Sequence, residues 1–243
     1  MGFEHLIILL CAALIPPFKL MRIDFKMDRV EPEPRPLLIR LFLFGVLCAI
    51  PVLVLEIWGQ KIADLFGSEP LTFAFISYFI IPGFIEEGMK YFVLRGCTWG
   101  HPAFNYKFDA VVYAVFASLG FAAIENVLYV FDYGVGVAVT RAVMAIPAHA
   151  TFGVIMGEGY ARAKVLFMAG DTAGAKSHSA RAWLIAAFAH GAYDFLIMTY
   201  GGALFAIYFI ALIVGGVTLA KTCARNDAPV GPSVTGGIET DPQ

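Results

Sequence analysis

The chain alternates between apolar blocks of roughly 20 residues and short polar stretches. A block of that length lets a helix cross the ~30 Å hydrocarbon layer of a membrane. Length and punctuation together predict about seven membrane spans. The expected spans are 2–18, 37–58, 71–95, 108–131, 135–158, 182–200 and 202–220. The first is short, so its pattern also fits a helix lying at the membrane surface. We therefore expect an all-α, polytopic transmembrane helix bundle.

Composition supports a membrane protein. Of the 243 residues, 59% are hydrophobic and only 15% are charged, whereas a soluble domain has about 25% charged residues. We expect one transmembrane domain, 1–225, surrounded by lipid. A tail over 226–243, rich in Pro, Gly, Thr and Asp, is predicted to be disordered. The net charge of -2 gives no support for a nucleic-acid partner. None of the four cysteines forms a C-x-x-C pair, so neither a disulfide framework nor a thiolate zinc site is indicated.

Basic residues predict the orientation. They gather in every second connection and in the tail, whereas the alternate connections carry Lys61 alone, with Arg141 just inside the fifth span. Because loops rich in Lys and Arg stay in the cytoplasm, the amino terminus is predicted outside and the carboxyl terminus inside. The basic residues on the cytoplasmic side are Lys19, Arg22, Lys26, Arg29, Arg35, Arg95, Lys107, Arg162, Lys164, Lys176, Arg181, Lys221 and Arg225.

Charged side chains interrupt the third apolar segment, Leu71 to Leu94. Glu86 and Glu87 are adjacent, and Lys90 follows one helical turn later. Ionisable groups at membrane depth cost a few kcal/mol each and mark functional sites. The spacing lets both carboxylates reach the ammonium, while the ~100° between neighbours sends them in different directions. We expect one glutamate to pair with Lys90 and the other to face a cavity as a general base. Pro82, one turn earlier, is predicted to kink the helix.

Later spans add polar groups at similar depth. The fourth span carries Phe121, Glu125 and Asn126, and the fifth carries His149 just after Pro147. In the sixth span, His190 and Asp194 are spaced i, i+4, so the carboxylate can orient the imidazole and fix its tautomer. A single histidine in a helix is more often a packing residue. The pattern of four helices that each carry such groups instead predicts one shared, water-accessible cavity.

This ordered set of motifs resembles the PrsW family of intramembrane proteases. The similarity covers roughly 80–195, and rests on Glu86-Glu87-x-x-Lys90, Phe121-x-x-x-Glu125-Asn126, His149 and His190-x-x-x-Asp194. The PrsW proteins in turn resemble CAAX prenyl endopeptidases and bacteriocin-processing enzymes. The resemblance implies regulated cleavage of a membrane-anchored protein. In the best-known members, that substrate is an anti-sigma factor cut on its external side.

The resemblance leaves two mechanisms open. In the first, Glu86 or Glu87 activates water while His149 and His190 polarise it or stabilise the oxyanion. In the second, His149, His190 and one of the two glutamates hold a catalytic zinc ion. The histidines lie on different helices and no H-E-x-x-H motif is present, so spacing does not identify a metal site. We favour the first mechanism, which uses no cofactor; zinc is the cofactor that the second would use.

Two other classes use the same residue types. Intramembrane Glu, His, Asp and Lys side chains also form the ion pathways of proton- or ion-coupled transporters, which is the alternative function. A haem protein would use His149 and His190 as axial ligands, but would leave Glu86 and Glu87 unexplained. Both are weaker interpretations than a protease.

Overall fold

The computed structural model describes residues 3–231, and within that range the regular structure is helical apart from one isolated bridge between Tyr106 and Pro229. The elements are α1 (Phe3–Met27), α2 (Arg35–Leu47), α3 (Ala49–Ala63), η1 (Asp64–Phe66), α4 (Pro70–Ala74), η2 (Phe75–Ile80), α5 (Ile81–Thr98), α6 (Asp109–Tyr133), α7 (Val135–Val143), α8 (Ala145–Met168), α9 (Thr172–Thr199) and α10 (Gly202–Arg225).

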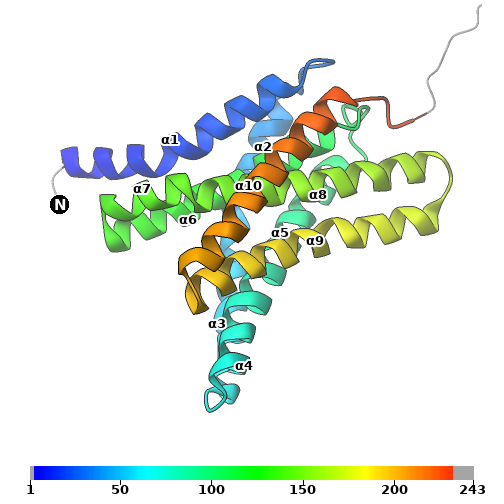
Figure 1. Ribbon diagram of the computed structural model, residues 1–243. Helices are drawn as coiled ribbons and strands as arrows, with labels where there is room; N and C mark the ends of the chain where they lie inside the picture. Colours follow the sequence, from blue (N-terminus) through cyan, green and yellow to red (C-terminus); the bar gives the residue numbers. More distant parts are fainter. Residues whose placement is uncertain (1–2, 232–243) are drawn as a thin grey trace, which may run out of the picture.

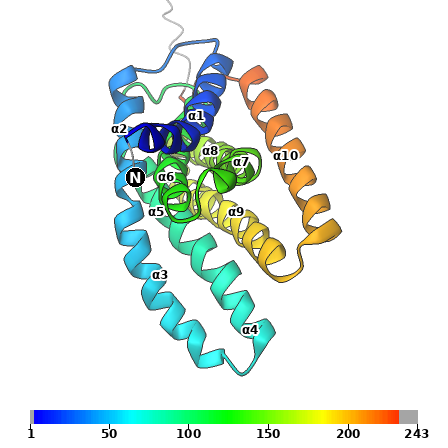
Figure 2. The same cartoon turned by 90° about the vertical axis from the view of Figure 1, so that its left-hand side faces the viewer.

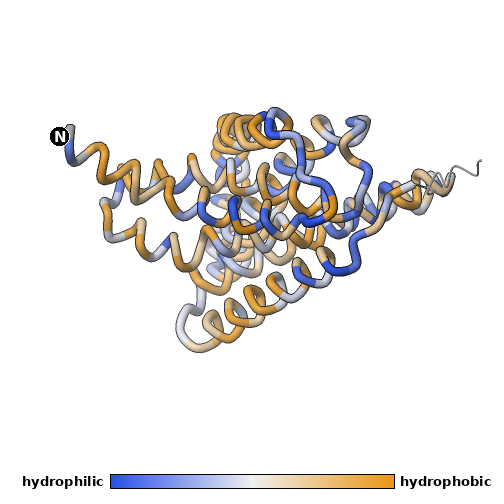
Figure 3. Tube along the Cα trace, turned by 90° about the horizontal axis from the view of Figure 1, so that it is seen from above, coloured by the Kyte–Doolittle hydropathy of each residue, from blue (hydrophilic) through white to orange (hydrophobic). Residues whose placement is uncertain are grey.

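Seven helical stretches in the described part of the chain are long and apolar enough to cross a membrane, which confirms the predicted number and the all-α class. Hydrophobic residues dominate these stretches, and hydrophilic ones gather around the connections (Figure 3). The seven stretches are Leu6–Met27, Arg35–Phe66, Pro70–Thr98, Asp109–Tyr133, Val135–Met168, Thr172–Thr199 and Gly202–Arg225. The second, third and fifth each combine two or three successive elements.

Helix boundaries differ from the predicted spans in two places. The first helix is not short: α1 runs to Met27 and continues through Pro16 and Pro17. The predicted basic loop between the fifth and sixth spans is mostly helical, because α8 extends to Met168 and α9 begins at Thr172. The predicted spans are shorter than the helices because they stop at charged residues. A hydropathy pattern marks where the hydrocarbon layer ends and not where a helix ends.

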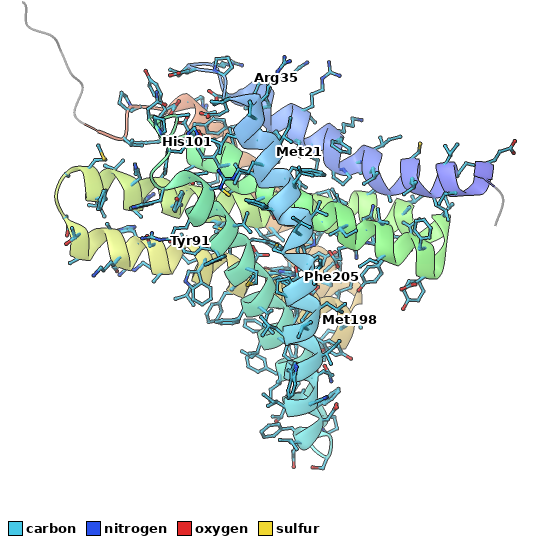
Figure 4. The ribbon with its side chains drawn as sticks, turned by 180° about the vertical axis from the view of Figure 1, so that it is seen from behind. Met21, Arg35, Tyr91, His101, Met198 and Phe205 are labelled. Carbon is cyan, nitrogen blue, oxygen red and sulfur yellow. The ribbon has the colours of Figure 1, made fainter. Side chains whose placement is uncertain are left out.

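Helix α6 lies at the centre of the molecule, between α1, α2 and α8 (Figures 1 and 2). The α2–α3 and α4–α5 stretches run together, and their α3 and α4 ends project away from the rest. Viewed from behind, Arg35 and His101 mark one end of the molecule, while Met198 lies toward the other (Figure 4). The bundle therefore has a loop-rich end around Arg35 and His101, and an opposite end around the α3–α4, α6–α7 and α9–α10 turns.

Two stretches that carry candidate catalytic residues are irregular near a proline. The π-helical turn η2 ends immediately before α5, which has Pro82 in its first turn. A π turn shifts the hydrogen-bond register where proline supplies no donor, and such turns are frequent at functional sites. The kink predicted at Pro82 thus takes the form of this π turn. Met144 separates α7 from α8 three residues before Pro147.

Glycines bring α5 and α9 into close contact. A Cβ added at Gly83 would lie 2.5 Å from the carbonyl oxygen of Ala187, and one at Gly191 would lie 2.3 Å from that of Phe79. Small residues at a crossing let two membrane helices approach at backbone distance. Because Gly191 follows His190 directly, this contact fixes the distance between that histidine and the glutamates on α5.

Replacing two glycines of α5 by alanine, one at a time, tests this contact. Gly83→Ala should lower the melting temperature, because overpacking a close crossing costs about 1–3 kcal/mol. Gly88→Ala should leave it unchanged or raise it, because a Cβ there has nothing within 4 Å and alanine favours the helix by up to ~1 kcal/mol. Thermal unfolding of the detergent-purified proteins measures both. Equal effects of the two changes would contradict the close-contact role.

The first residues of the predicted disordered tail are paired. The backbone N–H of Val230 donates to Asn105 O at 2.8 Å, and the N–H of Lys107 donates to Ala228 O at 3.0 Å. Ordered structure therefore continues beyond the predicted boundary at 226, because the segment adds hydrogen bonds to the loop before α6. The remainder of the predicted tail, 232–243, lies outside the described residues.

Candidate active site

Lys90 lies between the two adjacent glutamates of α5. Its Nζ donates to Glu86 Oε2 at 3.0 Å and to Glu87 Oε1 at 2.7 Å, so both glutamates pair with it and not one alone. The Glu87 side chain is fully buried, while that of Glu86 is 8% exposed. The ammonium also lies 4.2 Å from the centre of the Phe121 ring. Lys90 thus compensates the charge of a carboxylate pair that would otherwise be prohibitively costly at this depth.

His190 is held between two carboxylates. Its Nδ1 lies 2.9 Å from Glu87 Oε1, and its Nε2 lies 3.3 Å from Asp194 Oδ2. The i, i+4 spacing on α9 therefore does bring Asp194 to the ring. The second Glu87 oxygen, Oε2, is buried without a hydrogen-bond partner. Contacts at both ring nitrogens fix the orientation of His190.

His149 is held in a similar way. Its Nδ1 lies 3.2 Å from Lys90 Nζ, and its Nε2 lies 2.9 Å from Glu125 Oε2. The hydroxyl of Ser118 donates to the His149 carbonyl at 2.7 Å, which joins α6 to α8 directly below the ring. In both histidines Nδ1 contacts a charged side chain of α5, Glu87 or Lys90, whereas Nε2 contacts a carboxylate that lines the cavity, Asp194 or Glu125.

These groups surround one cavity of about 670 Å³. The candidate residues that line it are Glu86, Phe121, Glu125, His149, His190 and Asp194. Glu87 and Lys90 lie behind the lining, in contact with His190 and Glu86. Most of the remaining wall is apolar, with side chains such as Val52, Ile81 and Phe152. The cavity thus combines a mostly apolar wall with a set of carboxylates and imidazoles.

Comparison with known proteins extends the likeness far beyond the motifs. The model of the PrsW family, described as intramembrane metalloproteases, matches 33–218. The chain belongs to the PrsW family of intramembrane proteases. It is 33% identical to "Protease PrsW" of Geobacillus kaustophilus over 193 residues, which cover 78% of this chain and 80% of that protein. It is 31% identical to "Protease PrsW" of Bacillus subtilis over 194 residues, 78% of this chain and 82% of that protein.

A shorter match has higher identity. "Protease PrsW" of Halalkalibacterium halodurans is 38% identical over 157 residues, which cover 65% of this chain and 70% of that protein. No solved structure matches the chain significantly. Membership of the PrsW family makes the protein a membrane-embedded endopeptidase, and does not favour the transporter interpretation.

The haem interpretation conflicts with the geometry. The imidazole rings of His149 and His190 are in edge contact, with centroids 5.2 Å apart. Axial ligands must stand on opposite faces of a porphyrin. No macrocycle fits between two rings in direct contact, so these histidines do not form an axial pair.

The sequence did not single out two further charged groups of this PrsW-family cavity. Arg141, on α7, lies 2.8 Å from Glu125 Oε2 and donates to Asn126 Oδ1 at 3.0 Å. Glu56, on α3, also lines the cavity. Both lie near the ends of predicted apolar spans, where charges are ordinary. A charge at a span end becomes informative only once helices from elsewhere in the chain surround it.

Asn126 does not line the cavity. Its Nδ2 donates to the carbonyl of Ala13 at 2.7 Å, and its Oδ1 accepts from Arg141. Asn126 therefore joins α1 and α7 to α6. Among the candidate residues it is a positioning group for Arg141, and through Arg141 for Glu125.

Proposed function

We propose that this PrsW-family protease hydrolyses a peptide bond of a membrane-anchored protein with Glu86 as the general base. The supporting observation is the unequal placement of the two glutamates: Glu86 lines the cavity, whereas Glu87 is fully buried against Lys90 and His190. A base must lie within reach of the water that it deprotonates. Glu87 has the complementary role of holding His190 and Lys90 in place.

The reaction uses these groups in sequence. Glu86 takes a proton from water as the water oxygen bonds to the carbonyl carbon of the scissile peptide. His190 and His149 line the cavity beside Glu86, and an Nε2–H that turns from its carboxylate partner to the oxyanion stabilises it. The carbon–nitrogen bond then breaks, and Glu86 returns its proton to the leaving nitrogen. Asp194 and Glu125 orient the two imidazoles before the substrate binds.

The same residues fit a zinc ion in part. Glu86, Glu87, His149 and His190 each offer one ligand atom, all within 4.8 Å of one another. Each histidine also has a carboxylate at its outer nitrogen, as metal-binding histidines usually do. These four would hold the ion, which would supply a Lewis acid and an acidified water. However, the Lys90 ammonium already lies 2.7–3.2 Å from three of them and would have to leave.

Chelation separates the two mechanisms. Because the Lys90 ammonium neutralises the carboxylates, we expect purified active protein to lack stoichiometric zinc and to remain active after treatment with a strong chelator. Metal analysis and a cleavage assay on the same sample measure this. One equivalent of zinc, lost in both His149→Ala and His190→Ala, would instead establish the metalloenzyme.

The substrate class follows from the cavity and from the family resemblance. An apolar wall around a polar centre suits a segment of a membrane-spanning helix that unwinds into it. An anti-sigma factor is the first candidate to test. Purified protein in detergent should cut a single-span anti-sigma factor at one position near its external membrane boundary. Intact substrate after prolonged incubation with active enzyme would exclude that substrate.

We infer that the amino terminus is outside and the carboxyl terminus in the cytoplasm. The basic residues concentrate at the loop-rich end, and the opposite end carries Lys61. The cavity lies toward that opposite end, since its lining includes Gln60 near the end of α3 and Met198 near the end of α9. In this orientation the cavity serves a cut on the external side, and the loop-rich end is cytoplasmic.

Thiol labelling in intact cells tests the orientation. Cys11, Cys48, Cys97 and Cys223 are first replaced. A cysteine at exposed Ser68 should then react with a membrane-impermeant reagent, whereas one at exposed Ser177 should react only after permeabilisation. The opposite labelling pattern would invert the orientation.

A further inference from the structure

A second cluster of carboxylates lies at the loop-rich end of the molecule, away from the active-site cavity. Asp28 and Glu33 belong to the segment between α1 and α2, and Asp109 is the first residue of α6. All three are buried, and each places a carboxylate oxygen within 4.8 Å of the others. Two segments distant in the sequence, the α1–α2 connection and the start of α6, thus bring three carboxylates to one point.

Asp28 has few partners. The residue is only 9% exposed, and its carboxylate is approached by the backbone N–H groups of Val30 and Glu31, neither of which completes a full hydrogen bond. Asp24, one turn earlier on α1, is 6% exposed and also has an unpartnered oxygen, Oδ2. A buried carboxylate without hydrogen bonds is costly, so such a group pairs with a cation, binds a metal or takes up a proton.

No basic side chain compensates this cluster. Among residues 3–231, no Lys, Arg or His nitrogen lies within 4.0 Å of a carboxylate oxygen of Asp24, Asp28, Glu33 or Asp109. Of the basic residues nearest in sequence, Lys26, Arg29 and Arg35 are exposed, and Lys107, two residues before Asp109, is half-buried and makes no such contact. The active-site carboxylates have Lys90 and Arg141 as counter-ions, so the absence of one here is a specific property of the loop-rich end.

The remaining contacts hold the carboxylates in place without neutralising them. The backbone N–H groups of Asn105 and Tyr106 donate to Asp109 Oδ2 at 3.0 and 2.7 Å. The hydroxyl of Tyr113 donates to Glu33. Asp227, in the segment after α10, accepts from the N–H of Phe108 at 2.8 Å and lies close enough to interact electrostatically with Asp28. These bonds fix the positions of the carboxylates but supply no positive charge.

We propose that Asp28, Glu33 and Asp109 form a binding site for a hard divalent cation, Ca²⁺ or Mg²⁺. The donor set consists of oxygens alone, which suits these two ions and distinguishes the site from the histidine-containing active site. The cation would join the α1–α2 segment to the beginning of α6. Since α6 carries Glu125, the site would stabilise the helix that positions His149, at the opposite end from the chemistry.

Thermal unfolding of the full-length, chelator-treated protein in detergent tests the site. Ca²⁺ and Mg²⁺ are added separately and compared with NaCl at equal ionic strength. At about 100-fold over the dissociation constant, the preferred ion should raise the melting temperature of this 243-residue chain by roughly 5–10 °C. Isothermal titration with each ion alone should give one equivalent bound, and the tighter of the two identifies the ion.

Two variants locate the effect. Asp28→Asn removes the charge and keeps an oxygen that faces the Val30 and Glu31 N–H groups, so it should keep the fold and lose both the thermal shift and the bound equivalent. Glu31→Gln removes the same charge from an exposed position three residues away and should retain both. If Asp28→Asn were too unstable for melting, equilibrium dialysis against Ca²⁺ or Mg²⁺ at low temperature would still decide. Equal binding by wild type and Asp28→Asn, or binding lost instead in His149→Ala, would overturn the proposal.

Discussion

Glu86→Gln should reduce substrate cleavage by about 10²–10⁴-fold, the usual contribution of a general base. The amide keeps the volume of the side chain but does not accept a proton from water. Glu86 lines the cavity and shares Lys90 with Glu87, so its loss leaves one carboxylate to balance the ammonium. The variant should therefore remain folded and membrane-inserted. Initial cleavage rates of a single-span substrate, normalised to protein eluting in the folded peak, measure the effect.

Two comparisons make this result specific. Glu69→Gln removes one charge from an exposed position before α4 and should cleave at the wild-type rate. Glu87→Gln should lose both activity and stability, because Glu87 holds Lys90 and His190 at once. If Glu86→Gln retained full activity while Glu87→Gln stayed stable and inactive, the two roles would have to be exchanged.

Lys90→Gln should cause the largest loss of stability. Removing one partner of a buried ion pair costs about 3–5 kcal/mol, because the remaining charges stay buried without compensation. The residue is 1% exposed and contacts Glu86, Glu87 and His149. The melting temperature in detergent should fall by about 6–20 °C. Lys19→Gln, at an exposed position on α1, should cause no measurable change.

A double substitution tests whether charge compensation is the reason. If Lys90 serves to neutralise the glutamates, then Glu87→Gln combined with Lys90→Gln should be more stable than the sum of the two single effects predicts. Strict additivity would show that Lys90 contributes packing and not charge. The same preparations indicate whether zinc binds more tightly once the ammonium is gone, as the ligand geometry at Glu86, His149 and His190 leads us to expect.

Hydropathy was sufficient to predict the helical class and the number of spans, because hydrocarbon thickness constrains both. It did not predict the helix ends. The helices α8 and α9 continue beyond the predicted span ends at 158 and 182, where the basic residues Arg162, Lys176 and Arg181 are exposed. Periodicity also did not reveal that α1 packs against α6, since the contacts involve single residues such as Leu9, Ala13 and Val130.

Local spacing predicted part of the site. The i, i+3 and i, i+4 relations gave the contacts of Lys90 with Glu86 and Glu87, and of His190 with Asp194. Contacts between helices required the fold: nothing in the spacing places Glu125 at His149 or Arg141 at Glu125. The carboxylates of Asp28 and Glu33 looked like ordinary loop charges, because burial by distant segments is invisible in the sequence.

The bond between Asn126 and Ala13 has a practical meaning for anyone who alters the amino terminus. A relay of side chains runs from the first helix through Asn126, Arg141 and Glu125 to His149. A fusion tag or a foreign leader that replaces or rotates α1 would release Asn126 and loosen the relay one partner at a time. Enzyme produced in that way would reach the membrane intact and still cleave slowly, and its weak activity would be mistaken for a poor choice of substrate.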